Sequence, residues 1–328
     1  MNTSKPSAPP AAARSGGHRP PDLDELPPIF RWPPRFKQCL MWLWHDVVFP
    51  FGIFFFALAV MTWQWLTPDL ARMATLQPGW MLTIWLRNAA LLCAVAGGLH
   101  WWLYIKRAQG GDLKYDRRWP ARGNRAFLWG DQVKDNMFWS LASGSLIWSL
   151  YESVTLWLYA SGRVSVVAWS EAPLYLSALA ALVFFWGSLH FYLIHRLLHW
   201  PPLYRLAHEL HHRNVNVGPW SGISMHPVEH LLYFSPVVLW WVVPADPVII
   251  IATGFFTGLG PAFTHAGFER IRIGSFSLPA GAWHHQLHHR LFEVNYGNPR
   301  APLDQLFGTW HDGGAEAHAR LMARRRGG

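Results

Sequence analysis

Long apolar runs separated by short polar connections dominate the first two thirds of the chain. Four of the runs hold at least the ~20 apolar residues that a helix needs to cross a bilayer. These predicted membrane spans are residues 39–66, 79–105, 136–160 and 173–198. A further apolar stretch, 231–264, is broken by prolines and by Gly258 and Gly260, which favours a re-entrant hairpin or a buried helix pair. The pattern predicts an all-α integral membrane protein with four transmembrane helices in two hairpins and a cytoplasmic helical cap.

The polar segments divide the chain into four predicted regions. Residues 1–37 are rich in Pro, Ala, Ser, Gly and Arg, and we expect a disordered cytoplasmic tail there rather than a cleaved signal peptide. Residues 38–184 form an N-terminal transmembrane region, and residues 185–311 form a histidine-rich region. Residues 312–328 form a basic C-terminal tail.

Composition agrees with a membrane protein. Hydrophobic residues make up 51% of the chain and charged residues only 14%, whereas about a quarter of the residues of a soluble domain are charged. The 22 tryptophans are typical of bilayer interfaces. The net charge of +9 lies in connections and tails, which favours anionic lipid headgroups over nucleic acid as a partner. Cys39 and Cys93 form no metal or redox motif.

Basic residues predict the orientation in the membrane. The connection between the second and third predicted spans carries eight Lys and Arg residues, whereas the other two carry only Arg72 and Arg163. Because cytoplasmic connections are enriched in basic residues, we expect both termini and the exit of the fourth span to be cytoplasmic. The histidine-rich region then lies on the cytoplasmic side of a membrane of the bacterial inner-membrane type.

Twelve of the eighteen histidines lie within residues 195–289. Two five-residue segments, 208–212 and 285–289, repeat the pattern His-x-Leu-His-His. Residues three and four apart share a helix face, and neutral imidazole binds iron, zinc, copper and nickel. Because so many ligands exceed the needs of one ion, we predict a dimetal site. The candidate ligands are His195, His199, His208, His211, His212, His265, His285, His288 and His289, with His226 and His284 as further candidates.

Some histidines also have a structural interpretation. His195 and His199 fit an interfacial pair that touches headgroups, and His265 fits a hydrogen-bonded core histidine. His190 points about 140° away from His195 around a helix and is expected to bind no metal. Four further histidines fit interfacial or tail positions: His45, His100, His311 and His318.

Two acidic residues interrupt the apolar spans, Asp46 in the first and Glu152 in the third. Ionisable groups at membrane depth face the interior of a helix bundle. Each fits either an interhelical hydrogen bond or a polar end of a substrate tunnel.

The motifs of residues 185–311 resemble those of the fatty acid hydroxylase and sterol desaturase superfamily, which are membrane di-iron enzymes. The matching motifs are HRLLH (195–199), HELHH (208–212), HPVE (226–229), THAG (264–267), HHQLHH (284–289) and NYGNPRAPLDQLFGTW (295–310). Ser188 and Leu193 stand where the superfamily usually has aspartate and tryptophan, and Leu303 stands where tryptophan usually precedes Asp304. These differences leave the substrate open.

The resemblance implies a catalytic region that binds two iron ions, with zinc as a substitute. It also implies O₂-dependent hydroxylation or desaturation of a sterol-like or fatty acyl membrane lipid. The chain has no haem, iron–sulfur or dinucleotide motif, so we expect an external electron donor of the ferredoxin or cytochrome type. Four arginines are candidates for docking that donor or for contacting headgroups: Arg205, Arg213, Arg290 and Arg300.

Two other classes of protein use buried histidines. A zinc-dependent intramembrane hydrolase needs the same ligands and a general base, for which Glu209 or Glu229 is available. A metal transporter needs histidines along a transmembrane path, whereas here they cluster after the fourth predicted span.

Overall fold

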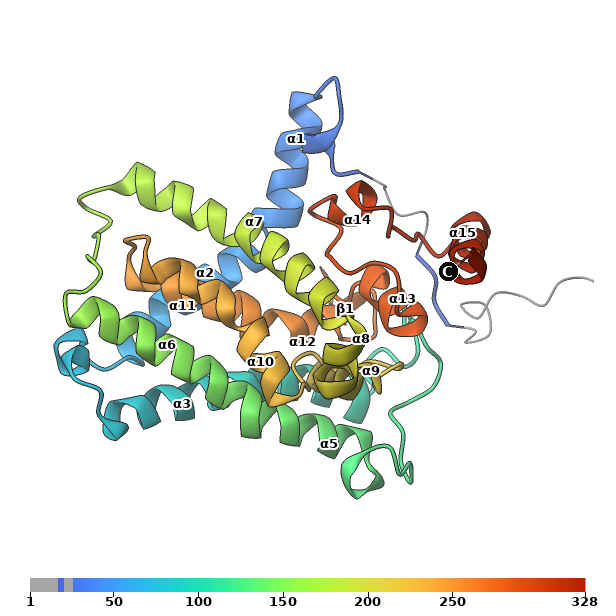
Figure 1. Ribbon diagram of the computed structural model, residues 1–328, viewed down its shortest axis with the longest axis horizontal. Coiled ribbons are helices and arrows are strands. Elements are labelled where there is room, and N and C mark those ends of the chain that lie inside the picture. The colour runs from blue at the N-terminus through green and yellow to red at the C-terminus, as the bar shows by residue number, and fades with distance from the viewer. Residues whose placement is uncertain (1–16, 21–25, 328) are drawn as a thin grey trace, which may run out of the picture.

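The computed structural model describes residues 17–20 and 26–327, which form a mostly helical protein with one β-hairpin in the described part (Figure 1). The helices are α1 (Phe36–Trp42), α2 (Phe51–Trp65), α3 (Pro78–Leu92), α4 (Gly98–His100), α5 (Gln132–Trp139), α6 (Ser145–Ala160), α7 (Pro173–Leu198), α8 (Pro201–Leu203), α9 (Glu209–His212), α10 (Pro227–Tyr233), α11 (Pro247–Gly258), α12 (Gly260–Thr264), α13 (Trp283–Leu291), α14 (Leu303–Leu306) and α15 (Ala315–Gly327). The strands are β1 (Arg270–Ile273) and β2 (Phe276–Pro279), which pair antiparallel.

Several of these helices are joined end to end by π-helical turns. α3 and α4 belong to one rod, Pro78–Ile105. α5 continues into α6, and α8 continues into α9. A proline occupies one of the first two positions of α3, α7, α8, α10 and α11, where its fixed φ suits a helix and its missing N–H is not needed.

Three helical segments are long and apolar enough to cross a membrane, and a bent pair forms a fourth if it counts as one span. They are Pro78–Ile105, Pro173–Leu198, Pro247–Thr264 and the pair Phe36–Val48 with Phe51–Trp65. These segments identify a multi-pass membrane protein. The predicted third span, 136–160, is helical but is not among them, because polar residues such as Ser149 and Glu152 lower its hydropathy. The stretch 231–264 instead supplies a mostly buried helix, so the arrangement of four spans in two hairpins remains a prediction.

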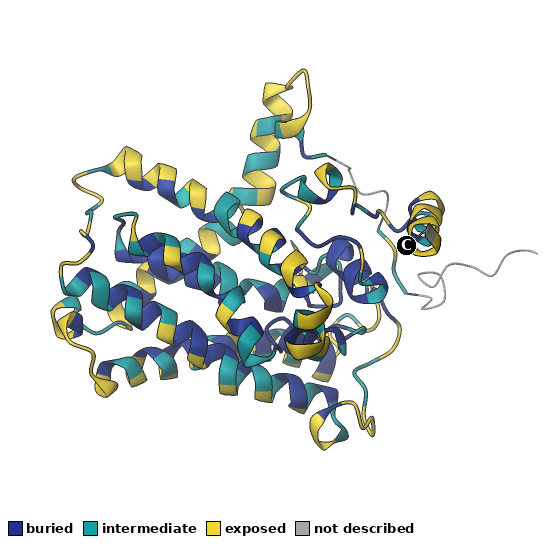
Figure 2. Ribbon diagram, viewed as in Figure 1, coloured by how far each residue is buried: buried dark blue, intermediate teal, exposed yellow. Residues whose placement is uncertain are grey.

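α11 lies at the centre of a group of long helices. It packs against α2, α6 and α7, and nearly all of its residues are buried (Figures 1 and 2). The indole of Trp148 lies on Gly254 and Gly258, where an added Cβ would come within 2.7 and 2.8 Å of it. Small residues therefore allow α6 and α11 to pack closely.

A buried polar network joins α3 to α6. Arg87 forms an ion pair with Glu152, whose other carboxylate oxygen accepts a hydrogen bond from Asn88 Nδ2 at 2.9 Å. Asn88 also donates to Ser149, and Arg87 donates to Thr67. Glu152 therefore makes an interhelical contact, the first of its two interpretations.

Both ends of the described chain pack against the rest of the fold. Leu321 of α15 is buried against Leu287 and Leu291 of α13. The prediction of a basic tail over 312–328 did not anticipate the helix α15. The backbone N–H of His18 donates to the carbonyl of Lys114 at 2.7 Å. Most of the predicted N-terminal tail, residues 1–16 and 21–25, lies outside the described residues.

Candidate metal centre

Nine histidines converge at the C-terminal end of α7. They come from the last turn of α7 and the residue after it, from the rod of α8 and α9, from the residue after α12, and from α13. Trp200 is extended and Pro201 starts the next helix, so the chain turns back immediately after α7. This turn brings the first two histidine groups face to face.

The first cluster contains five histidines: His195, His199, His208, His212 and His288. The Nε2 atom of His212 lies 3.2 Å from that of His199, 3.1 Å from that of His208 and 3.0 Å from that of His288. The ring of His195 packs beside His288, with a centroid distance of 4.3 Å. One nitrogen of each ring lies within 4.8 Å of the others.

The second cluster contains four histidines, and all of them are buried: His211, His265, His285 and His289. The Nε2 atom of His285 lies 3.0 Å from that of His265 and 3.1 Å from that of His289. The Nε2 atoms of His265 and His289 are 3.2 Å apart. The structure therefore brings together all nine residues that the sequence analysis selected.

The repeated five-residue motif divides its histidines between the clusters. His208 and His212 belong to the first cluster, whereas His211 belongs to the second. In α13 the division is reversed, because His285 and His289 belong to the second cluster and His288 to the first. Each motif thus contributes a pair four residues apart to one cluster and the residue between them to the other.

The outer nitrogens of five rings are held by oxygen acceptors. The Nδ1 atoms contact Tyr296 O (from His195, 2.6 Å), Glu229 Oε1 (from His208, 2.7 Å), Ser224 O (from His211, 3.3 Å), Pro261 O (from His265, 3.1 Å) and Val294 O (from His288, 2.6 Å). A carbonyl only accepts, so Nδ1 carries the proton in the rings that face one. The Nε2 lone pair of those rings then points into the cluster, which is the arrangement of a metal ligand.

Burial keeps the rings in the neutral form that binds metal. Desolvation lowers the pKa of His199 to about 3 and that of His211 to about 4. Desolvation also lowers the pKa of His212 and His289 well below the usual histidine value, and neighbouring histidines lower both further.

The donor set fits two metal ions. At a metal–nitrogen distance of about 2.1 Å, two ligands at right angles lie about 3.0 Å apart, close to the observed Nε2 spacing. Lone pairs that face one another at this spacing need a cation between them. Among the described residues no carboxylate belongs to either cluster, so both sites offer nitrogen donors, which suit iron, zinc and copper.

The two further candidates, His226 and His284, belong to neither cluster. His226 Nδ1 accepts a hydrogen bond from the backbone N–H of Val228 and caps α10. His284 packs against Trp310, with its Nε2 atom 3.5 Å from a carboxylate oxygen of Asp304. The side chain of His226 is therefore engaged as a helix cap, whereas His284 lies outside both clusters with no hydrogen bond from its ring nitrogens to the described residues.

Other histidines have structural partners. His230 bonds Ser143 Oγ and the carbonyl of Ile223, and His190 bonds Ser235 Oγ. His311, expected in a tail or at the interface, is instead buried, and its backbone N–H donates to the side chain of Asn295.

The carboxylate of Asp304 organises the loop after α13. It accepts hydrogen bonds from the backbone N–H groups of Tyr296 and Gly297, each at 2.8 Å, and from Thr309 Oγ1 at 2.6 Å. These bonds fix the carbonyl of Tyr296 that receives the proton of His195. Sequence reasoning missed this supporting role, and only the motif resemblance marked the segment.

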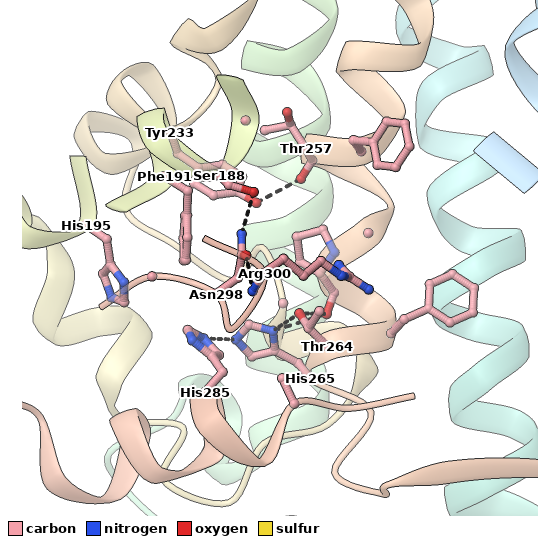
Figure 3. A pocket seen from close by; sticks show the side chains of 18 of the residues that line it. Ser188, Phe191, His195, Tyr233, Thr257, Thr264, His265, His285, Asn298 and Arg300 are labelled. Carbon is pink, nitrogen blue, oxygen red and sulfur yellow. Dashed lines mark hydrogen bonds between the residues drawn. The ribbon is translucent and has the colours of Figure 1, made fainter. Parts of the chain in front are cut away.

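An apolar cavity of about 260 Å³ adjoins the clusters. His195, His265 and His285 line it at one side, as Figure 3 shows. Aromatic side chains line much of the remainder: Phe51, Phe55, Phe184, Phe191, Phe256 and Phe263. These come from α2, α7, α11 and α12, so the cavity connects the histidines with the membrane helices.

Comparison with known proteins identifies the family. The sequence profile of the fatty acid hydroxylase family matches residues 180–309. The Delta(7)-sterol-C5(6)-desaturase of Nicotiana tabacum is 30% identical over 240 residues, which cover 71% of this chain and 84% of the tobacco protein. The chain belongs to the fatty acid hydroxylase and sterol desaturase superfamily. The segment matched by the profile includes all nine clustered histidines of this superfamily member.

The matches to two fungal members are shorter. The Delta(7)-sterol 5(6)-desaturases of Eremothecium gossypii and Saccharomyces cerevisiae are 29% and 30% identical over 137 and 124 residues. These matches span 38% and 32% of the two fungal proteins. No solved structure matches this member of the superfamily significantly.

The structure shows the surroundings of two residues that differ from the superfamily pattern, Ser188 and Leu193. Ser188 accepts a hydrogen bond from Asn298 Nδ2 at 2.8 Å and lines the cavity. Leu193 is 53% exposed on α7. The first departure therefore changes the cavity wall, whereas the second changes the outer face of a membrane helix.

Proposed function

We propose that the protein is an O₂-dependent di-iron oxidoreductase that hydroxylates or desaturates a membrane lipid with a sterol-like or fatty acyl skeleton. Its superfamily and the desaturases that it resembles support the coarser part of this proposal, a lipid-modifying oxidoreductase. The observation that carries the proposal is the shared wall between two nitrogen-lined clusters and one apolar cavity.

Two bound iron ions would supply the redox chemistry that breaks an unactivated C–H bond. Hydroxylation consumes O₂, two electrons and two protons, and yields the alcohol and one water. Desaturation uses the same oxidant and reductant, but removes two hydrogens from the lipid and yields two waters.

In this proposal the residues of the chain hold the metal ions, orient the ligand rings and exclude water from the cavity. The nine histidines would hold the ions, and the Nδ1 contacts to Tyr296 O and Val294 O fix the direction of two of their rings. Phe191 packs beside His195 and His285 and keeps the cavity wall apolar next to the first and second clusters. The cavity therefore excludes water and decides by proximity which carbon reacts.

The electrons would come from an external donor of the ferredoxin or cytochrome type. Of the four candidate docking arginines, only Arg205 is exposed. Arg213 donates to the carbonyl of Ala126, and Arg290 donates to that of Tyr115. Donor docking on the basic connections, and a cytoplasmic location of both termini and the metal centre, are part of this proposal.

The zinc hydrolase alternative needs a free general base beside the metal. Glu209 is exposed. Glu229 is buried, and its Oε1 atom is engaged by His208 Nδ1 at 2.7 Å. Its Oε2 atom has no hydrogen-bond partner among the described residues. The contact with His208 supports a ligand-orienting role for Glu229, and the O₂ requirement of turnover decides between oxidation and hydrolysis.

Lipid profiling tests the proposal directly. We expect lipids of a host that expresses the protein to gain one oxygen atom or to lose two hydrogens, and expect this change to require O₂. His318→Ala is a matched control, because His318 lies on α15 outside both clusters. Turnover of a lipid ester or amide without O₂, by protein that contains zinc, would contradict the proposal.

A further inference from the structure

The cavity is lined by an arginine side chain, Arg300, that the proposed chemistry does not use. Arg300 lines the cavity, and its guanidinium extends away from His195 and His285 (Figure 3). It lies over the ring of Phe184 at 5.3 Å. No carboxylate among the described residues lies within 4.0 Å of it, so it forms no ion pair in that part of the chain.

The loop that carries Arg300 is fixed against α7. Asn298 Nδ2 donates to Ser188 Oγ at 2.8 Å, and Asn298 Oδ1 accepts a hydrogen bond from the backbone N–H of Arg300 at 3.1 Å. Ser188 in turn donates to the carbonyl of Phe184. The position of Arg300 is therefore built into the cavity wall.

The neighbouring polar groups of the cavity are already engaged. Tyr233 donates its hydroxyl proton to the carbonyl of Thr257 at 2.9 Å, and Thr257 Oγ1 donates to the carbonyl of Thr253. Thr264 Oγ1 contacts Pro261 O and His265 Nδ1. Among the described residues, the guanidinium of Arg300 donates no hydrogen bond to a protein acceptor, so its donors are available to a ligand.

Arg300 and the metal centre lie at different depths. Phe184 precedes His195 by eleven residues of α7, or about 16 Å along the helix axis. Both residues line the same cavity. A ligand held at the guanidinium must therefore extend along the cavity to present a carbon to the histidine clusters.

We propose that Arg300 binds an anionic head group, a carboxylate or a phosphate, of the lipid substrate. This inference rests on the proposed function, because it takes the cavity as the substrate site. Arg300 is partly buried and has no carboxylate of the described residues within ion-pair distance, and carboxylate and phosphate are the groups that match its fork of N–H donors. A single neutral hydroxyl offers one acceptor and no negative charge to this fork of donors.

Asp46 is the acidic group that faces this site from the first membrane segment. It lines the cavity on the π-helical turn between α1 and α2. Burial lowers the pKa of Arg300, and the charge of Asp46 raises it. Because Asp46 would repel an incoming anion, removing its charge should strengthen anion binding, whereas removing that of Arg300 should weaken it.

Binding of radiolabelled oleate and of its methyl ester to the purified protein in detergent at pH 8 tests the inference. We expect oleate to bind about tenfold more tightly or better, the usual contribution of a charge-assisted hydrogen bond. Arg300→Gln should abolish this preference, Arg300→Lys should keep most of it, and Asp46→Asn should keep or increase it. Oleoyl lysophosphatidate serves as the phosphate-bearing probe, and an Arg300-dependent preference for either anion supports the inference.

Equal affinity for oleate, lysophosphatidate and the methyl ester would overturn it. A preference that survives in Arg300→Gln, with thermal unfolding unchanged from the wild type, would also overturn it. The assay needs neither metal nor turnover, so its outcome is independent of whether the protein consumes O₂. Failure of the proposed function would appear as unchanged lipids and no O₂ use, with the charge preference of binding intact.

Discussion

Two buried polar regions of this protein differ in whether protein groups alone satisfy their polar atoms. Between α3 and α6, the charge of Arg87 is met by Glu152, and the second carboxylate oxygen is met by Asn88. In the histidine clusters, oxygen acceptors hold five outer nitrogens, while the inner nitrogens face one another at 3.0–3.2 Å. The first region is closed by protein groups alone, whereas the facing lone pairs of the second are a donor set for cations. This difference separates a structural network from a ligand site.

Removal of a ligand should have the largest effect. We expect His288→Ala and His211→Ala to reduce lipid turnover to background while membrane insertion stays intact, because each removes a donor from a different cluster. Lipid mass spectrometry of membranes that contain equal amounts of each variant checks this. Turnover retained in both variants, at the level of His318→Ala, would remove the basis for treating the clusters as catalytic.

Breaking the closed network should instead reduce stability. Glu152→Ala leaves Arg87 buried without its counterion, which typically costs about 3–5 kcal/mol. Thermal unfolding of the purified protein should show this loss, and its metal content should remain that of the wild type. The double variant Arg87→Met, Glu152→Met should recover much of the stability. A loss of metal in Glu152→Ala at unchanged stability would show that the two regions are not distinct.

Weakening the outer contact of one ligand should have a smaller and local effect. Glu229→Gln replaces the carboxylate that holds His208 Nδ1, and loss of such a partner typically lowers metal affinity about 10–100-fold. Because His208 belongs to the first cluster, chelator titration should remove one ion from this variant more easily and leave the other unaffected. Equal weakening of both ions would contradict the assignment of His208 to one cluster.

The helical spacing of the histidines selected eight of the nine converging residues, and the position of His265 at the end of the apolar stretch 231–264 selected the ninth. Their division between two clusters follows from the same geometry. On a helix of 3.6 residues per turn, positions four apart differ by about 40°, whereas a position three along lies about 60° to the other side. His211 therefore points away from the direction shared by His208 and His212. The sequence shows which histidines share a direction, but it does not show where α13 lies relative to them.

Other features depend on tertiary contacts that a local pattern does not contain. Arg300 was a candidate for docking the electron donor or for contacting headgroups, because the sequence shows its charge but not the direction of its loop. The predicted third span was placed by its apolar residues, whereas the polar residues of that helix form the network with α3. The helix α15 was missed because its basic residues read as a tail, although Leu321 anchors it to α13.

The metal content of the purified protein tests the central claim most directly. Elemental analysis should find two ions per chain, and His288→Ala and His211→Ala should each lose one while His318→Ala keeps both. One ion or none in the intact protein, or unchanged content in both ligand variants, would contradict the assignment of a separate metal to each cluster.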